Sequence, residues 1–378
     1  MSFIKSTVLF SLLFSLLFSL LLFIVIADSG SSGTSTVATP PETPLQVPNT
    51  NLILNGINPS DYARSFVFSP YFYSGDYEYL GIQMMTQVTG QSQTLLSTMP
   101  ASLQAITWAF AIGECGSETW SGVTAADFAK ANVGTFVDAG KYYIVSTGGG
   151  HPFLCNSNAD FIRFIDTYYS TNMIGVDFDI EASSTTQTDV NNLVAVIVAA
   201  QAQFPNLRYS FTVGSDGGNQ AQSLGSFGKW VMAAIKTSGL KNYTINLLVM
   251  DYTVSGTANP TICTMENSTN CDMGASALTA AQNLHNYYGV PYHQIELTPM
   301  IAENDNPYDI FSITDAVTVS AFAVSNQLAG VHFWAYSRDK NSTGASSGAT
   351  DTGNSAGFAG TLGYTNVFLT ELGLLTAN

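Results

Sequence analysis

Three carboxylates alternate along one short apolar run of the sequence. Asp177, Asp179 and Glu181 occupy every second position, and the residues between them are apolar. Successive side chains of a β-strand point to opposite faces, so the three acids share one face, with about 6.6 Å of backbone between neighbours. Burying carboxylates costs several kcal/mol unless they are paired or share protons. Such a row therefore indicates a site of chemistry.

A pair of acids in this row is suited to glycosidic bond cleavage. Two carboxylates in alternate positions of a strand titrate as a coupled pair, and repulsion and partial burial raise the pKa of one of them. A proton then stays available near neutral pH beside a second, ionised carboxylate. The alternatives are a hard-cation site and a buried structural network. A cation site is expected in a loop with Asn, Asp and Gly, not on a strand with Phe178 and Ile180 between the ligands.

Eight strand-like runs alternate with helix-like segments over most of the chain. The runs are Phe66–Tyr73, Ala105–Ile112, Tyr142–Thr147, Ile174–Ile180, Leu207–Val213, Thr244–Tyr252, Gln294–Ile301 and Gly330–Tyr336. The helix-like segments include Ala125–Ala139, Phe161–Ser170, Val190–Phe204, Ser226–Ser238, Ala275–Tyr288 and Ile313–Leu328. This alternation predicts the α/β class and a parallel (β/α)8 TIM barrel. An open doubly wound sheet is less favoured because no glycine-rich fingerprint follows the first run.

The barrel prediction gives the acidic row a functional position. Glu181 directly follows the fourth predicted strand. Active sites of TIM barrels lie at the C-terminal ends of the strands. We therefore expect the acids to lie at the mouth of the barrel.

The charge of the chain limits its partners. Its 378 residues include 27 acids and 11 bases, and the net charge is -16. No cluster of Lys and Arg occurs, which argues against a nucleic acid partner, because phosphate neutralisation needs a basic face. The four histidines lack metal-ligand spacing, so we expect neither a metal nor a cofactor. An uncharged or cationic polymer is compatible, and no protein partner is indicated.

The N-terminal residues predict export. Lys5 precedes the apolar run Val8–Ile26. Residues 1–27 are therefore expected to be a signal peptide of a secreted protein. The run is also long enough to be retained as a signal anchor, the one case in which we expect membrane attachment. Residues 28–51 are rich in Ser, Thr, Pro and Gly and predict a linker, followed by a catalytic domain at residues 52–378.

Four cysteines in an exported chain predict two disulfides. Cys263 and Cys271 enclose a short loop and are expected to pair. Cys115 and Cys155 follow successive predicted strands and could bridge adjacent loops, while the other two connectivities stay open. Three Asn-x-Ser/Thr sequons, at Asn242, Asn267 and Asn341, are consistent with a glycosylated secreted protein.

The segment from Gly175 to Glu181 resembles the Asp-x-x-Asp-x-Asp-x-Glu signature of family 18 glycoside hydrolases, the chitinases and their relatives. Further segments resemble strand ends of this family and of its bacterial-type subgroup, in the expected order. They are Phe68-Ser-Pro-Tyr71, Ser146-Thr-Gly-Gly149, Met250-Asp-Tyr252, Thr298-Pro-Met300, and Phe333-Trp334 with Arg338-Asp339. The resemblance implies an exported chitinase that cleaves β-1,4-linked N-acetylglucosamine polymers.

The resemblance also implies a retaining, substrate-assisted mechanism, which differs from the usual scheme of two catalytic carboxylates. Glu181 would protonate the leaving oxygen, and the acetamide carbonyl of the bound sugar would attack the anomeric carbon. Asp179 would hold that acetamide and stabilise the oxazolinium charge, and Asp177 would tune Asp179. Tyr252 would hydrogen-bond the acetamide carbonyl, and Trp334 would form the floor under the sugar ring.

Five further residues are candidates for substrate binding: Tyr71, Trp120, Met250, Asp251 and Met300. On a strand, Met250 and Tyr252 share one face, as do His332 and Trp334. Tyr71 and Trp120 are equally compatible with ordinary packing, and Trp334 could also be a core residue.

The sequence departs from the family pattern at two positions. Ile174 stands where the first Asp is expected, and Thr253 stands in the last place of the sixth-strand pattern Met-x-Tyr-Asp. Strand alternation would turn Asp251 away from Tyr252 unless a bulge intervenes. These departures keep open a chitin-binding, lectin-like protein with little or no activity. The shared acetamide chemistry keeps open an endo-β-N-acetylglucosaminidase acting on N-glycans.

Overall fold

The computed structural model describes residues 57–75, 82–253, 256–306, 308–340 and 359–375. The chain divides into two units, Met1–Val47 and Pro48–Asn378, and every described residue belongs to the second. The expected signal peptide (1–27), the expected linker (28–51) and the sequon at Asn341 lie outside the described residues.

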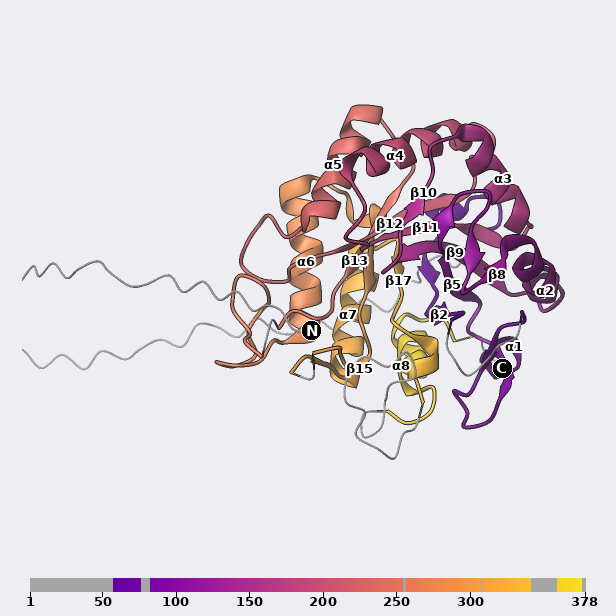
Figure 1. Ribbon diagram of the computed structural model, residues 1–378. Coiled ribbons are helices and arrows are strands. Elements are labelled where there is room, and N and C mark those ends of the chain that lie inside the picture. The colour runs from indigo at the N-terminus through magenta and orange to yellow at the C-terminus, as the bar shows by residue number, and fades with distance from the viewer. Residues whose placement is uncertain (1–56, 76–81, 254–255, 307, 341–358, 376–378) are drawn as a thin grey trace, which may run out of the picture. The chain divides into compact units, whose positions relative to one another are not determined.

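A single parallel sheet of nine strand segments forms the centre of the described unit (Figure 1). The segments are β1 (Val67–Phe68), β2 (Tyr71–Tyr73), β5 (Ala105–Ala111), β9 (Tyr142–Gly149), β11 (Met173–Ile180), β12 (Arg208–Gly214), β13 (Thr244–Leu248), β14 (Ile295–Thr298) and β17 (Gly330–Val331). Their order is β1-β17-β14-β13-β12-β11-β9-β5-β2. The two ends of this order, β1 and β2, are consecutive in the chain, so the sheet closes on itself. The predicted (β/α)8 barrel is confirmed.

Ser69 and Pro70 divide the first barrel strand into β1 and β2. β1 pairs with β17 and β2 pairs with β5, so one strand joins the two sides of the barrel. Proline has no N–H to donate, but the Pro70 carbonyl accepts a bond from Thr107 N at 2.9 Å. Tyr71 N then bonds the carbonyl of Phe333 at 3.0 Å, which extends the seam toward the barrel mouth.

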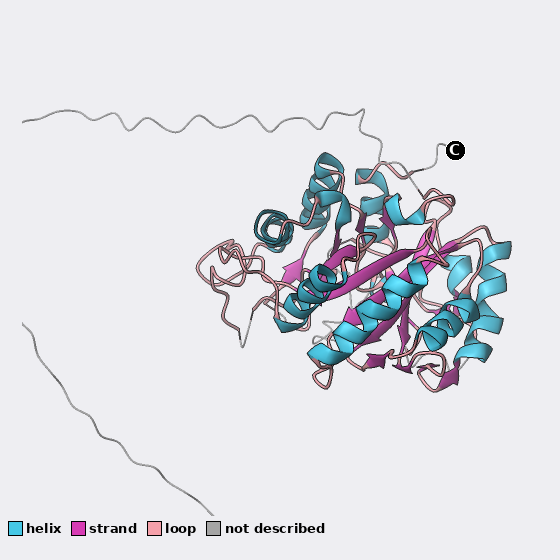
Figure 2. Cartoon of the chain, turned by 90° about the horizontal axis from the view of Figure 1, so that it is seen from above, coloured by secondary structure: helices cyan, strands magenta, loops and turns pink. Residues whose placement is uncertain are grey.

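Helices follow the barrel strands and lie on the outside of the sheet (Figures 1 and 2). They are α1 (Leu95–Thr98), α2 (Ala125–Asp138), α3 (Asn158–Tyr168), α4 (Gln187–Gln201), α5 (Ser226–Ser238), α6 (Met273–Tyr288), α7 (Ile313–Asn326) and α8 (Gly363–Glu371). No helix in the described part of the chain has both the length and the apolar content needed to cross a membrane.

Short elements decorate the loops. They are the strands β3 (Met85–Thr86), β4 (Gln93–Thr94), β6 (Gly113–Glu114), β7 (Thr119–Trp120), β8 (Val123–Thr124), β10 (Phe153–Leu154), β15 (Ala302–Glu303) and β16 (Ile310–Phe311), and the 3-10 turns Tyr62–Arg64, Tyr292–Gln294 and Tyr336–Arg338. Antiparallel pairs join β3 to β4, β7 to β8 and β15 to β16, whereas β6 and β10 pair in parallel.

Local sequence signals fix several helix ends. Thr186 and Asp189 form a capping box at the start of α4, in which each side chain accepts a bond from the backbone N–H of the other residue. A cap of this kind contributes about 1 kcal/mol. Gly239 ends α5 in the left-handed conformation, at φ 73°, where a side chain would be strained.

The predicted strands are all present, but three of them end at least three residues early. The sixth ends at Leu248 instead of Tyr252, the seventh at Thr298 instead of Ile301, and the eighth at Val331 instead of Tyr336. Asp251 adopts φ 52°, a left-handed conformation that interrupts an extended strand. The apolar run therefore continues past the sheet into the mouth of the barrel.

The two faces of β11 have opposite environments. Outward-facing Phe178 packs against Phe161 and Phe211, with ring centroids 6.0 and 5.5 Å away, in the layer between sheet and helices. The alternating inward positions hold Asp177 and Asp179. Strand alternation thus separates an apolar outer core from a polar barrel interior, as the sequence predicts.

A buried charged group fills the N-terminal end of the barrel interior. Arg208 forms an ion pair with Glu296, and His332 Nε2 lies 3.7 Å from the other Glu296 oxygen. The guanidinium also donates to the carbonyls of Tyr62 and Ser65. Burial would raise the pKa of Glu296, but the adjacent Arg208 and His332 more than offset it and lower this pKa to about 2. Each charge at this end therefore has a partner within the protein.

Candidate active site

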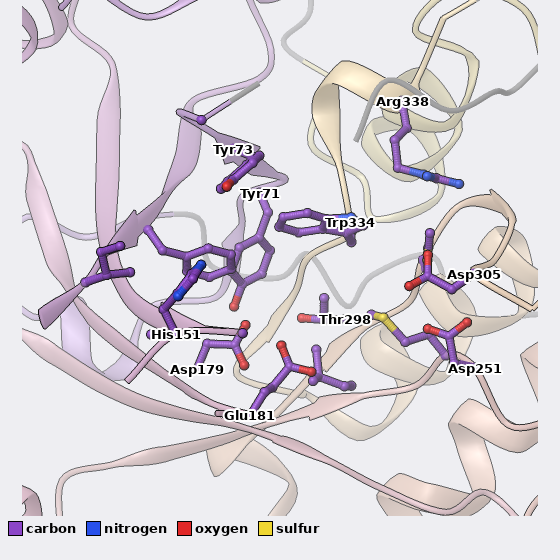
Figure 3. Close-up of a pocket in the computed structure, with 18 of the residues that line it drawn as sticks. Tyr71, Tyr73, His151, Asp179, Glu181, Asp251, Thr298, Asp305, Trp334 and Arg338 are labelled. Carbon is purple, nitrogen blue, oxygen red and sulfur yellow. The ribbon is translucent and has the colours of Figure 1, made fainter. Parts of the chain in front are cut away.

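A cavity of about 590 Å³ opens at the C-terminal mouth of the barrel (Figure 3). Seven of the ten predicted catalytic and substrate-binding residues line it: Tyr71, Asp179, Glu181, Met250, Asp251, Met300 and Trp334. They come from the ends of different strands, which converge at this face of a TIM barrel. Three predicted residues, Asp177, Tyr252 and Trp120, lie outside its lining.

Asp177 lies below the cavity and is fully hydrogen-bonded. Strand register places Ser146 of β9 and Ser210 of β12 directly beside it. Its four donors are Ser146 Oγ (2.6 Å) and Tyr71 OH (2.8 Å) on Oδ2, and Ser210 Oγ (2.5 Å) and Thr212 Oγ1 (2.6 Å) on Oδ1. Burial raises the pKa of Asp177, and these hydroxyls oppose that rise without cancelling it. Asp177 therefore acts on the site only through its neighbours.

Asp179 is buried at the cavity floor without comparable donors. Its side chain is 6% exposed, and Oδ1 has no hydrogen-bond partner among the described residues. Burial, followed by the charges of Glu181 and Asp177, raises its pKa well above the usual range. Gly148 on β9 lies beside it, and a Cβ on Gly148 would come within 2.1 Å of the Asp179 carbonyl oxygen. Only glycine permits this close approach.

Glu181 is the first residue after β11 and points into the cavity beside Asp179 (Figure 3). Its side chain is open to solvent, but the cavity walls partly desolvate it. This desolvation, together with the charges of Asp251 and Asp305, raises its pKa. No group of three or more His, Cys, Asp or Glu side chains in the described residues could hold a metal ion.

Aromatic rings form one wall of the cavity. Trp334 is half-buried and stacks on Phe110, with centroids 5.7 Å apart and an interplanar angle of 12°. Tyr71 and Tyr73 lie against Trp334 at 6.2 and 6.0 Å. An apolar ring face next to carboxylates is suited to bind a sugar ring by stacking.

Sequence reasoning missed several residues of the cavity. Phe110 lines it as well. So do His151, Asp305 and Arg338 (Figure 3). Phe110 carried a usable signal, because it stands near the C-terminal end of the second predicted strand. His151 and Asp305 lie in loops, where strand alternation gives no orientation.

Tyr252 does not occupy its predicted place. Since Asp251 leaves the strand conformation, Met250 and Asp251 both line the cavity, and Tyr252 does not. Tyr252 is instead buried behind the cavity, with 2% of its surface exposed. The expectation that Met250 and Tyr252 share a face is therefore corrected, whereas the hydrogen bond from Tyr252 to an acetamide stays a prediction.

Trp120 has a packing role, one of the two roles its sequence allowed. Its ring stacks on Phe128 with centroids 4.0 Å apart and an angle of 6°. Its indole N–H donates to Tyr168 OH at 2.8 Å, and Tyr168 donates to Glu118 at 2.7 Å. The ring is buried under α2 and α3, so the substrate-binding prediction for Trp120 is wrong.

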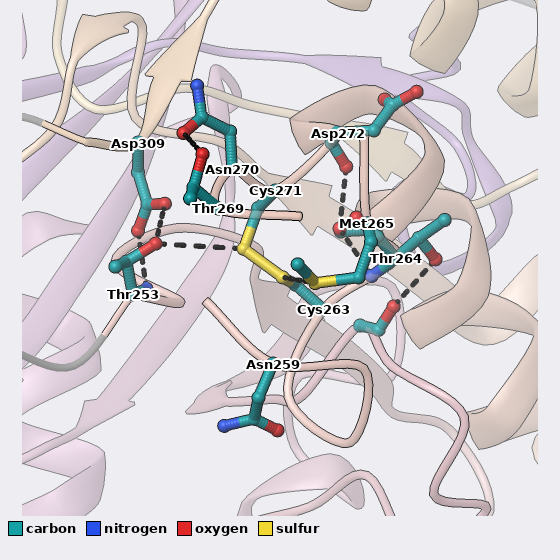
Figure 4. Close-up of a disulfide and its surroundings, with 12 residues drawn as sticks. Thr253, Asn259, Cys263, Thr264, Met265, Thr269, Asn270, Cys271, Asp272 and Asp309 are labelled. Carbon is teal, nitrogen blue, oxygen red and sulfur yellow. Dashed lines mark hydrogen bonds between the residues drawn. A yellow bond between two sulfur atoms is a disulfide. The ribbon is translucent and has the colours of Figure 1, made fainter. Parts of the chain in front are cut away.

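Both predicted disulfides are present. Cys115 pairs with Cys155 and Cys263 pairs with Cys271, with Cα atoms 5.2 and 5.7 Å apart. The second disulfide lies beside Thr253, whose Oγ1 is 3.7 Å from Cys271 Sγ (Figure 4).

Thr253 links the disulfide loop to the loop that carries Asp305. Its backbone N–H donates to Asp309 Oδ2 at 2.7 Å, and its hydroxyl donates to the other Asp309 oxygen (Figure 4). Asp309 precedes β16, the partner strand of β15. Thr253, one of the two positions at which the sequence departs from the family 18 pattern, therefore anchors a loop of the cavity. Its own side chain does not line the cavity.

Comparison with known proteins supports the fold. No protein-family model and no curated protein sequence matches the chain. Among solved structures, catalytic-site mutants of active domain 2 of a chitinase from Pyrococcus furiosus superpose with a TM-score of 0.62 at 21% identity, over 86% of this chain and 99% of theirs. A mutant complexed with chito-oligosaccharides gives 0.61 at 20% identity, over 84% and 99%. The chain therefore has the fold of these chitinases.

Proposed function

We propose that the protein is a glycoside hydrolase that cleaves β-1,4-linked N-acetylglucosamine polymers, as the resemblance of its motifs implies. The observation that carries the proposal is the pair Asp179 and Glu181 at the barrel mouth, next to the ring of Trp334. The matched Pyrococcus furiosus proteins are chitinases, which supports the same substrate class.

The buried carboxylate supports a role in holding the acetamide. Asp179 Oδ1 lacks a donor in the described residues, and a buried acceptor without a donor is costly. An acetamide N–H of a sugar stacked on Trp334 supplies that donor. The acetamide carbonyl oxygen is then held for attack on the anomeric carbon of the same sugar.

The raised pKa of Glu181 supports its role as the acid. As the glycosidic C–O bond breaks, the leaving oxygen takes the proton of Glu181, and the acetamide oxygen bonds to the anomeric carbon. The oxazolinium positive charge develops beside Asp179. Water then attacks the anomeric carbon, the bond between that carbon and the acetamide oxygen breaks, and the water passes one proton to the Glu181 carboxylate. The two displacements together leave the product with its original configuration.

Replacing Glu181 with Gln tests this proposal. Loss of the general acid is expected to lower kcat on chitin oligomers about a hundred- to ten-thousand-fold. Glu371→Gln, an exposed charge change on α8, is the matched control and is expected to leave kcat unchanged. Wild-type turnover by Glu181→Gln would contradict the proposal. NMR of the first product provides a second test, because retention releases the β-anomer.

The position of Tyr252 favours one alternative, a chitin-binding protein without activity. Tyr252 lies outside the cavity, and the apolar core residue Ile174 replaces the first acid of the family motif. Both departures reduce the polar groups available to the acetamide. Incubating the wild-type protein with a soluble chitin oligomer separates the alternatives, because a binding protein retains the oligomer and releases no product.

The proposed enzyme acts outside the cell. Two disulfides in the described residues support an oxidising environment. The expected signal peptide at residues 1–27 is tested by N-terminal sequencing of protein recovered from the medium. Mature protein beginning at Asp28 would support cleavage, and protein that stays with the membrane fraction would support a signal anchor.

A further inference from the structure

Two carboxylates of the cavity have no role in the proposed mechanism. Asp251 and Asp305 are both exposed and lie on the side of Glu181 away from Asp179 (Figure 3). Two hydrogen bonds hold Asp251 to the loop that carries Asp305: its N–H donates to Asn304 Oδ1 at 3.1 Å, and its Oδ1 accepts from Asn306 N at 3.2 Å. Although Asp251 is exposed, the cavity walls partly desolvate its carboxylate, and this desolvation, followed by the charge of Asp305, raises the pKa of Asp251 to about 6. The pair therefore places two like charges side by side in the cavity.

The cavity as a whole has more acidic than basic side chains. Four carboxylates line it, and Arg338 is its one Lys or Arg side chain among the described residues. Arg338 already donates to the carbonyl of Glu303. Asp179, which is 6% exposed, also brings an unpartnered oxygen to the same cavity, and the proposed mechanism assigns an acetamide N–H to that oxygen. A ligand that satisfies this cavity must bring N–H donors and positive charge.

We propose that Asp251 and Asp305 bind the protonated amino group of a glucosamine unit, so that the preferred substrate is partially N-deacetylated chitin. This inference rests on the proposed function. The unit over Trp334 must keep its acetamide, because that group attacks the anomeric carbon. The adjoining unit toward Asp251 carries the free amine, whose ammonium group pairs with both carboxylates.

Neutral chitin gives these carboxylates no counter-charge. Its hydroxyl and acetamide groups can hydrogen-bond to Asp251 and Asp305, but the repulsion between the two acids persists. An ammonium group relieves that repulsion and strengthens binding about 1.4- to 5-fold for each solvent-exposed pair. Such a contribution is large enough to set a preference between two otherwise similar polymers.

The first experiment compares kcat/KM on a partially deacetylated chitosan and on a fully acetylated chitin oligomer. EDTA is present throughout, so that a metal ion cannot occupy the acids. We expect the double variant Asp251→Asn with Asp305→Asn to lower the chitosan-to-chitin ratio of kcat/KM about tenfold, and Asp305→Asn alone to lower it about threefold. The ratio is the readout because both variants alter the cavity.

Two controls distinguish direct charge pairing from other effects. Asp166→Asn removes an exposed acid on α3, on the outside of the barrel and not among the cavity residues, and is expected to leave the ratio unchanged. In the wild type the ratio should fall as NaCl rises from about 0.05 to about 0.5 M, because salt screens exposed charge pairs. A ratio that neither the double variant nor salt changes would overturn the inference.

Binding separates failure of the inference from failure of the proposed function. In the Glu181→Gln background, calorimetry with a glucosamine trimer should show about tenfold weaker binding after Asp251→Asn with Asp305→Asn, while binding of the N-acetylated trimer changes less. Hydrolysis of chitin with an unchanged substrate ratio would refute the inference alone. Charge-dependent glucosamine binding without any hydrolysis would refute the proposed function and retain the amine site.

Discussion

The two ends of the barrel interior treat carboxylates in opposite ways. At the N-terminal end, Glu296 is 1% exposed, pairs with Arg208 and has a lowered pKa. At the mouth, Asp179 is almost as buried but faces Glu181 instead of a cation, and its pKa is raised. Burial is similar, so the difference comes from the neighbours. Glu296 at one end therefore has a charge partner within the protein, whereas Asp179 at the other end has an oxygen without a hydrogen-bond partner in the described residues.

We therefore expect the charged residues at the N-terminal end of the barrel to contribute mainly to stability, and those at the mouth mainly to function. A paired buried charge is strongly destabilising when its partner is removed. An unpaired buried acid already reduces stability, and is kept where a ligand uses it. Mutations at the two ends should therefore affect different measurements.

The largest effect is expected at the paired end. Arg208→Met leaves Glu296 buried without its cation and should lower the free energy of unfolding by about 3 to 5 kcal/mol. Denaturant unfolding measures this loss. Arg64→Met is the control, because Arg64 pairs with Asp61 at 3.6 Å while 81% exposed, and such a pair contributes at most about 1 kcal/mol. Equal losses of unfolding free energy in Arg208→Met and Arg64→Met would contradict the expectation that the buried ion pair contributes more to stability than the exposed one.

The mouth should show the reverse response. Asp179→Asn removes a buried charge that Glu181 and Asp177 repel, so the free energy of unfolding should stay the same or increase. If the proposed mechanism holds, turnover of chitin oligomers should fall about a hundredfold, because the oxazolinium charge would lose its counter-charge. Both quantities are measured on one preparation. A loss of stability comparable to that of Arg208→Met would show that the two ends do not differ.

The smallest effect is the pH dependence of stability, which should differ in sign between the ends. Glu296 has a folded pKa of about 2 against 4.5 unfolded, so its contribution is lost as pH falls from about 4.5 toward 2. Asp251 has a folded pKa of about 6 against 3.8, so stability declines as pH rises from about 4 to 6.

Urea unfolding at closely spaced pH values tests both slopes. Asp251→Asn should flatten the decline between pH 4 and 6 and leave the loss at lower pH intact. The change is small because Asp251 is exposed and its charge is screened by solvent. A variant that alters only the low-pH slope would contradict the assignment.

The fold could be predicted because its strands are long apolar runs with a simple period. The face shared by Asp177 and Asp179 followed from alternation alone, and so did the apolar layer around Phe178. The limits of the sixth strand did not follow. Its sequence stays apolar beyond Leu248, and only the left-handed backbone at Asp251 shows where the strand ends.

The site was predicted where strands carry it and missed where loops do. Trp334 follows a strand and was found, whereas Asp305 reaches the cavity from a loop whose path depends on Thr253 and Asp309. Trp120 shows the other limit. An aromatic residue in a loop can face a cavity or the core, and that choice depends on packing partners distant in sequence, such as Tyr168.

The divided first strand also determines when the barrel can be completed. Val67 pairs with Gly330, so the seam of the barrel joins residues from nearly opposite ends of the described chain. Contacts between such distant residues form slowly, because a long loop must first be ordered. During synthesis, β1 is made early but waits for the last strand, with its pairing edge open to other chains. The seam is therefore the region in which chaperone binding would protect the nascent chain most.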